Sequence, residues 1–110
     1  MAQKPIRWVT SALEDLRKFT ANARREAGYQ LYRVQSGLTP TDWKPMSSVG
    51  RGVYEIRVRG GRDYRVFYVA VFEEAVYVLH AFEKRTQKTR AADIELGKKR
   101  LAAVQRVRKR

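Results

Sequence analysis

The sequence contains no cysteine and only one histidine, His80, among its 110 residues. Without cysteine the chain cannot form disulfides or use a thiolate nucleophile, and a single histidine argues against a zinc site. No stretch reaches the roughly 18 apolar residues that a membrane-spanning helix needs. The first ten residues, MAQKPIRWVT, lack the apolar core of a signal peptide. These absences predict a cytoplasmic protein with no metal, no small-molecule cofactor and no membrane partner.

Acidic residues are also scarce, and their shortage is uneven along the chain. There are 24 lysines and arginines against 11 acidic residues, which gives a net charge of +13. Residues 84–110 alone hold 11 basic and 2 acidic side chains. A strongly basic face predicts a polyanionic partner such as nucleic acid, the ribosome or an acidic protein. For the basic tail, at about 105–110, a purely solubilising role is the alternative.

The length and composition predict one domain over residues 1–110. Three helices are expected. The first begins at Ser11, which forms a capping box with Glu14, and runs to about residue 19. The second covers about 21–35. The third covers about 91–107, with Thr89 as its cap and Gly97 as a local weakness.

Three strands are expected between the second and third helices, at about 53–59, 63–71 and 75–84. Short turns join them, so they should form an antiparallel meander. The segment IRWV, before the first helix, could add a short edge strand, and GLTPTDWKPMSSVGRG reads as a loop. The predicted class is α+β, with an N-terminal helical hairpin packed on an antiparallel β-meander followed by a C-terminal helix.

The turn RGGRD fixes which side chains share a face of this sheet, because a slip of one residue exchanges the two faces. A two-residue turn would place apolar residues opposite charged ones. A three-residue turn, residues 60–62, pairs Val58 with Tyr64 and Arg57 with Arg65, and it satisfies both faces. For the next hairpin, a two-residue turn at Glu73 and Glu74 is expected.

Together these turns predict one apolar face for the helical hairpin, formed by Tyr54, Ile56, Val58, Tyr64, Val66, Tyr68, Tyr77, Leu79 and Ala81. The other face is apolar at one end, where the C-terminal helix could cover it, and cationic at the other. It carries Glu55, Arg57, Arg59, Arg65, Phe67, Val69, Val78, His80, Phe82 and Lys84. Like charges this close are costly unless a carboxylate or another anion lies among them. The cluster is therefore either a phosphate site or a surface patch whose side chains extend into water.

The ordered segments YEIR, YRVFY and LHAFEKRTQKT, followed by a basic helix, resemble the RelE/HigB superfamily of type II toxins, in particular its phage-derived HigB-like branch. The resemblance covers about residues 52–101. It implies a microbial-RNase-like fold and metal-independent, ribosome-dependent cleavage of translated mRNA. It also implies neutralisation by a cognate antitoxin, often of the helix-turn-helix type.

Candidate site residues follow from the register and from the resemblance together. Arg57 and Arg65 are expected to hold the scissile phosphate, and Lys84 is the candidate acid or base. Flanking phosphates are assigned to Arg59, Arg85 and Lys88. His80 faces this site in the predicted register and is a further candidate for phosphate binding or for a general base. The alternative is that it is packed and hydrogen-bonded, as a lone histidine in a strand more often is.

Two other functions remain open at this point. One is a toxin of the same fold, similar to ParE, that inhibits DNA gyrase and cleaves nothing. The other is a phage accessory protein that binds nucleic acid without catalysis. The basic residues on one sheet face argue against the gyrase inhibitor, because binding a protein does not require them there.

Overall fold

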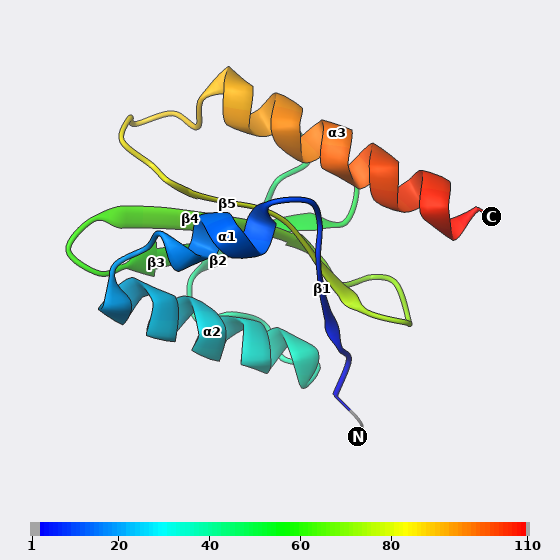
Figure 1. The fold of residues 1–110 in the computed structure, drawn as a ribbon, viewed down its shortest axis with the longest axis horizontal. Helices are drawn as coiled ribbons and strands as arrows, with labels where there is room; N and C mark the ends of the chain where they lie inside the picture. The colour runs from blue at the N-terminus through cyan, green and yellow to red at the C-terminus, as the bar shows by residue number, and fades with distance from the viewer. Residues whose placement is uncertain (1–2, 110) are drawn as a thin grey trace.

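A computed structural model describes residues 3–109 and shows one mixed sheet between two helical layers (Figure 1). The sheet has the strand order β1-β5-β4-β3-β2. The elements in chain order are β1 (Ile6–Trp8), α1 (Ala12–Arg17), α2 (Ala21–Gln35), β2 (Trp43–Pro45), β3 (Val53–Arg59), β4 (Asp63–Val69), β5 (Val76–Glu83) and α3 (Ala91–Arg108). Helices α1 and α2 cover one face and α3 covers the other, so the predicted α+β class is confirmed.

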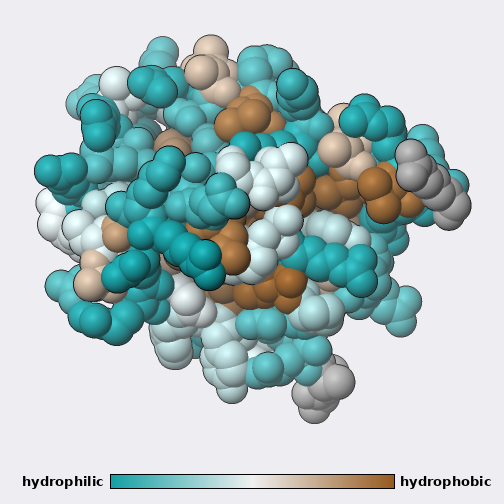
Figure 2. All heavy atoms as spheres, in the orientation of Figure 1, coloured by the Kyte–Doolittle hydropathy of each residue, from teal (hydrophilic) through white to brown (hydrophobic). Residues whose placement is uncertain are grey.

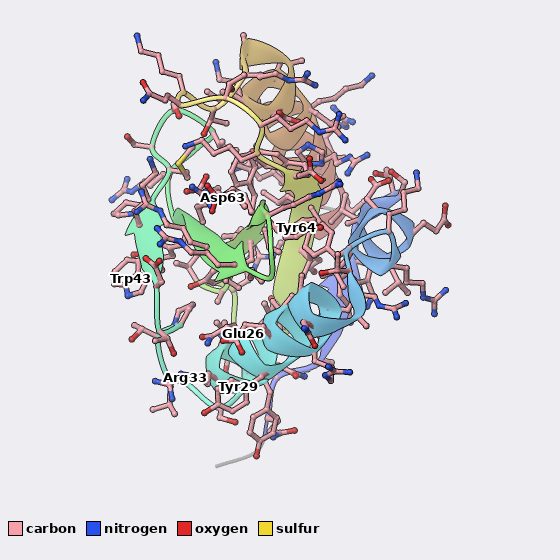
Figure 3. The ribbon with its side chains drawn as sticks, turned by 90° about the vertical axis from the view of Figure 1, so that its left-hand side faces the viewer. Glu26, Tyr29, Arg33, Trp43, Asp63 and Tyr64 are labelled. Atoms are coloured by element: carbon pink, nitrogen blue, oxygen red, sulfur yellow. The ribbon has the colours of Figure 1, made fainter. Side chains whose placement is uncertain are left out.

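Each face of the sheet has its own hydrophobic core. On the first face, Ala23, Ala27 and Leu31 of α2 recur at helical spacing and pack on β3, β4 and β5. On the second face, Leu101 and Val104 of α3 pack with the other side of the sheet. Figure 3 shows this layering edge-on, with the sheet between α2 and α3. The visible outer surface in Figure 2 is mostly hydrophilic, as this burial requires.

The bounds of α2 are as predicted, and Ser11 is the N-cap of α1 as predicted. The capping box expected at Ser11 is absent, however, and the predicted cap of α3 is wrong. Ser11 makes no capping hydrogen bond; its hydroxyl donates to Asp15 and accepts from Arg100 of α3, each at 2.9 Å. The N-cap of α3 is Arg90 rather than Thr89, and no side chain caps it. At α2 the N-cap is Thr20, whose hydroxyl accepts from the Ala23 amide.

The predicted register of the hairpin formed by β3 and β4 is confirmed. Arg57 lies opposite Arg65, Val58 opposite Tyr64, and Arg59 opposite Asp63. The three-residue turn between them needs a left-handed backbone at Gly61, where φ is 87°.

The predicted register between β4 and β5 holds for only half of its length. Phe67 lies opposite His80 as expected, but Tyr68 lies opposite Val78, which leaves Leu79 as the extra residue of a β-bulge. A turn does lie at Glu73 and Glu74, but the two-residue hairpin loop expected there is wrong, because β4 ends at Val69 and β5 begins at Val76. As a result Val78 faces the helical hairpin, whereas Tyr77 and Leu79 face α3, the reverse of the prediction.

Of the two edge strands, one was expected from the sequence and the other was not. The possible strand at IRWV is confirmed as β1, which pairs in parallel with β5. Strand β2 lies in a segment predicted as loop, and it pairs antiparallel with β3. Residues 105–108 of the predicted basic tail belong to α3, while Arg110 lies outside the described residues. Among residues 3–109 no helix is long and apolar enough to cross a membrane.

Gly97, predicted as a local weakness of its helix, is a contact point of α3 on the sheet. A Cβ atom at this position would lie 2.9 Å from Val49 Cγ1 and 3.1 Å from Phe67 Cδ2. The missing side chain therefore allows α3 to pack closely on β4, and this close packing offsets the poor helix propensity of glycine.

Candidate nucleic-acid interface

Four cations from four strands or strand ends surround one carboxylate on the α3 side of the sheet. We call Lys44, Arg57, Arg65 and Lys84 the basic cluster. Arg57 and Arg65 face each other across β3 and β4. Lys44 of β2 lies opposite Glu55 of β3, and Lys84 follows β5, where its amide donates to the Asp63 carbonyl at 2.8 Å. The structure thus brings together the three predicted catalytic residues and adds Lys44.

Glu55 is the carboxylate at the centre of the basic cluster, and it is completely buried. Its Oε1 atom lies 3.3 Å from Arg65 Nε and 3.5 Å from Arg57 Nε. Neither carboxylate oxygen has a hydrogen-bond partner among the described residues. The contacts are therefore ion pairs between one buried anion and two neighbouring guanidinium groups. Removal of either partner from such a pair normally costs about 3–5 kcal/mol of stability.

The two arginines differ in their access to solvent. The side chain of Arg65 is only 6% exposed, and its Nη1 atom also lies 3.7 Å from Asp63 and donates to the Tyr64 carbonyl at 3.3 Å. The side chain of Arg57 is 31% exposed. Arg65 thus forms the floor of the site, while Arg57 and the half-buried Lys84 provide its open part.

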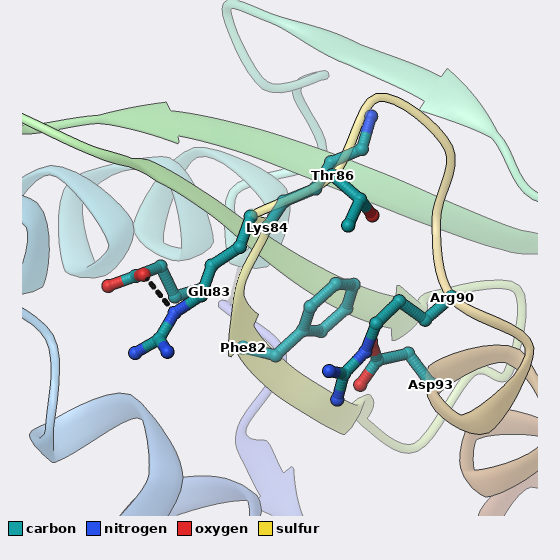
Figure 4. Close-up of a pocket in the computed structure, with 7 residues that line it drawn as sticks. Phe82, Glu83, Lys84, Thr86, Arg90 and Asp93 are labelled. Atoms are coloured by element: carbon teal, nitrogen blue, oxygen red, sulfur yellow. Dashed lines mark hydrogen bonds and ion pairs between the residues drawn. The ribbon is translucent and has the colours of Figure 1, made fainter.

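Lys84 lies between two surface hollows. One, of about 210 Å³, is lined by Phe82, Thr86, Arg90 and Asp93 as well as by residues 83–85. Figure 4 shows the Phe82 ring between Lys84 and the Arg90–Asp93 pair. The other hollow, of about 380 Å³, is lined by Lys44, Lys84, Lys88 and the segment around Ser47. Burial lowers the pKa of Lys84, and the nearby Arg65 lowers it further, so this amine loses its proton more readily than an ordinary lysine.

The residues predicted to bind flanking phosphates lie around the rim. Arg59 is exposed and pairs with Asp63 at 3.7 Å, on the same face as Arg57. Arg85 is exposed and pairs with Glu83, and Lys88 is exposed beside the second hollow. These three cations remain accessible from solvent.

His80 is not brought to the open surface. Its ring is buried, stacks on Phe82 with centroids 4.8 Å apart, and its Nε2 atom lies 2.8 Å from Asp93 Oδ1. Burial lowers the pKa of His80, and the hydrogen bond to Asp93 opposes this shift. The placement matches the packed, hydrogen-bonded alternative for a lone histidine.

Sequence reasoning missed Lys44 because residues 43–45 read as a loop. Once this segment pairs with β3, the period-2 alternation of strands puts Lys44 on the same face as Glu55. It also missed the Asp93–His80 bond, since the two residues lie in different elements, 13 positions apart in the chain. Among residues 3–109 no three His, Asp or Glu side chains are grouped as metal ligands.

The sequence model of a family described as phage-derived protein Gp49-like matches residues 14–102. The chain belongs to this family. The family falls broadly within the toxins of the RelE/HigB type, which generally pair with an antitoxin. A comparison with curated proteins gave no match. The match spans α2, all strands from β2 to β5 and most of α3, and it therefore includes the whole basic cluster.

Proposed function

We propose that this protein is the toxin of a type II toxin–antitoxin pair, of the HigB-like branch, and that it cleaves translated mRNA on the ribosome in the cytoplasm. The observation that carries the proposal is the basic cluster on one sheet face of a toxin-family fold. Two guanidinium groups lie side by side there and share one buried carboxylate. Lys84, whose pKa is lowered, lies next to them.

The chemistry proposed is attack of the ribose 2′-hydroxyl on the adjacent phosphate. The 2′-oxygen loses its proton and bonds to phosphorus to give a cyclic phosphate, the bond to the 5′-oxygen of the next nucleotide breaks, and this oxygen takes up a proton. The transition state carries additional negative charge on the non-bridging oxygens. Arg57 and Arg65 stabilise this charge, because guanidinium groups are permanently charged and donate in a planar fork. No metal ion is needed for this step.

Lys84 serves as the proton-transfer group. A general acid or base works best when its pKa is near the working pH, and burial and Arg65 both move the Lys84 pKa downward in that direction. Its position between the two hollows lets a single RNA strand pass over the amine with nucleotides on either side.

Flanking phosphates are bound by Arg59, Arg85 and Lys88, which are exposed around the rim, and by Lys44. This distribution suits mRNA held in the decoding site, where ribosomal RNA also presents phosphates. The cognate partner is an antitoxin, for which the helix-turn-helix type is our proposal from the family resemblance.

A cell-free translation reaction tests the proposal. Purified protein is added to a defined mRNA with and without ribosomes, and new 5′ ends are mapped by primer extension. Cuts inside codons that appear only with ribosomes are expected. Intact mRNA in both reactions would contradict the proposal, and a DNA gyrase supercoiling assay would then test the alternative toxin activity of this fold.

A further inference from the structure

We infer that Glu55 is a positioning residue of the candidate site: its buried carboxylate aligns the guanidinium groups of Arg57 and Arg65 while leaving hydrogen-bond donors free for an RNA phosphate. The inference rests on the proposed function for its cleavage step, but its effect on RNA binding does not depend on cleavage. The proposal makes Glu55 a counter-ion that sets how strongly, and in which geometry, the basic cluster binds an anion.

The geometry around Glu55 Oε1 is the first reason. This single oxygen lies within 3.5 Å of the Nε atoms of both arginines. Glu55 and Arg57 are two positions apart on β3, and Arg65 lies directly opposite Arg57 on β4, so all three side chains project from the same face. One rigid anion therefore fixes two guanidinium groups that would otherwise repel each other.

The second reason is that few N–H groups of the two arginines donate hydrogen bonds within the protein. A usual arginine–carboxylate pair consumes two N–H groups in a bidentate contact. Here no contact within the described residues has hydrogen-bond geometry at Glu55, Arg57 Nε or Arg65 Nε. The guanidinium group of Arg57 donates no hydrogen bond within residues 3–109, and that of Arg65 donates only one, to the Tyr64 carbonyl. The terminal N–H groups of Arg57, whose side chain is 31% exposed, remain available to a phosphate from the solvent side.

The charge balance is the third reason. Two carboxylates, Glu55 and Asp63, which lies 3.7 Å from Arg65 Nη1, face the four cations of the basic cluster, so the site keeps a net positive charge for its ligand. Glu55 also raises the pKa of Lys84, against burial and the other cations, which lower it. The same carboxylate thus influences both the phosphate-binding groups and the proton-transfer group.

The test compares Glu55→Gln with Glu95→Gln. Both substitutions remove one negative charge from the whole protein, but Glu95 is exposed on α3 and pairs only with Lys98 within the described residues. The first measurement is fluorescence anisotropy with a labelled single-stranded RNA, 2′-O-methylated so that it cannot be cleaved, over a series of salt concentrations. Circular dichroism confirms that each variant is folded.

Glu55→Gln should bind this RNA about three- to tenfold more tightly than wild type at low salt, because a charge that opposes the phosphate has been removed. The slope of log K against log salt should steepen by about 0.7, which corresponds to one more neutralised phosphate of a single strand. Glu95→Gln should stay near wild type. Equal binding by the two variants would overturn the inference, whether or not wild type cleaves mRNA.

The second measurement is ribosome-dependent cleavage by the same variants. Glu55→Gln should lower KM and also lower kcat by at least about tenfold, because the guanidinium groups bind more strongly but are no longer aligned. The apparent pKa that Lys84 gives to the pH profile of kcat should move to lower pH, because Glu55 no longer raises it. A purely structural role would reduce the active fraction while KM and the pH profile stay unchanged, and this result would refute the inference. Wild type that cleaves nothing would instead refute the proposed function.

Glu55→Asp decides the question if Glu55→Gln does not fold. Aspartate retains the charge but is one methylene shorter, so it should keep the RNA affinity and the salt slope within a factor of about two while kcat falls. An unchanged kcat in folded Glu55→Asp would show that the position of this carboxylate does not matter.

Discussion

His80 of β5 and Asp93 of α3 are hydrogen-bonded to each other at the edge of the hydrophobic core between the sheet and α3. Nε2 of the ring lies 2.8 Å from Oδ1 of the carboxylate. The bond joins the last strand to the first turn of the helix that covers it. It also places Asp93 at the wall of the hollow beside Lys84. The stability of this contact therefore bears on the shape of the candidate site.

Stability should fall as pH falls through the titration range of His80. Burial lowers the His80 pKa below its ordinary 6.5, so the unfolded chain binds the proton more readily than the folded chain. The contribution is fully present above pH 6.5 and is lost as pH falls toward the lowered folded value. Urea denaturation of wild type and His80→Gln between pH 5 and 8 measures it. The difference between the two proteins should change with pH, and parallel curves would contradict the expectation.

Asp93→Asn should lower the pKa of His80 further. The aspartate favours the charged imidazolium through its hydrogen bond and its charge, and asparagine removes the charge. Because His80 is the only histidine of the chain, its ring signals can be followed without ambiguity in an NMR titration. Glu95→Gln, which changes an exposed acid on the same helix, is the control and should leave the titration in place.

Gly97→Ala and Gly28→Ala should have opposite effects on stability. At Gly97 the new methyl group would lie 2.9 Å from Val49 Cγ1, so α3 or the Val49 side chain must move, and a loss of about 1–3 kcal/mol is expected. At Gly28, on the exposed side of α2, a Cβ atom meets nothing within 4 Å beyond the nearby backbone of its own helix, and a gain of up to about 1 kcal/mol is expected. Urea denaturation gives both values. A stabilising Gly97→Ala would mean that α3 does not pack closely there.

Arg100→Met should destabilise the protein more than Lys99→Met. The buried guanidinium of Arg100 donates to the Leu79 carbonyl and to the Ser11 hydroxyl, each at 2.9 Å. Methionine keeps much of the apolar stem but leaves these acceptors without their donors, at a cost of about 1–3 kcal/mol. Lys99 is the exposed neighbour and should change stability by less than about 0.5 kcal/mol. Equal urea midpoints for Arg100→Met and Lys99→Met would show that Arg100 does not stabilise the β-bulge at Leu79.

The same arginine explains why the register of β5 could not be predicted in full. The turn RGGRD allowed only one pairing that kept apolar residues opposite each other, so β3 and β4 followed from the sequence. In β5 the bulge at Leu79 is stabilised by Arg100, 21 positions along the chain, and alternation of residue types carries no information about such a distant donor. The prediction was correct from His80 onward and reversed before it.

Part of the candidate site could also be predicted from the sequence. Arg57 and Arg65 could be grouped because they lie on neighbouring strands across a predictable turn. The bond between His80 and Asp93 depends on how α3 packs on the sheet. The total burial of Glu55 is a property of the tertiary structure that strand alternation does not predict. Lys44 was missed because a three-residue edge strand that ends in proline gives almost no strand signal.

The most direct test of the central claim compares wild type, Arg65→Lys and Arg65→Ala in a ribosome-programmed cleavage reaction, with 5′ ends mapped by primer extension. Arg65→Lys keeps the charge but loses the planar fork that the transition state requires. We expect cuts within codons for wild type, a loss of at least about 100-fold in rate for both variants, and similar RNA affinity for wild type and Arg65→Lys. Full cleavage by Arg65→Lys or Arg65→Ala, or no cleavage by wild type, would contradict the claim that this sheet face cleaves RNA.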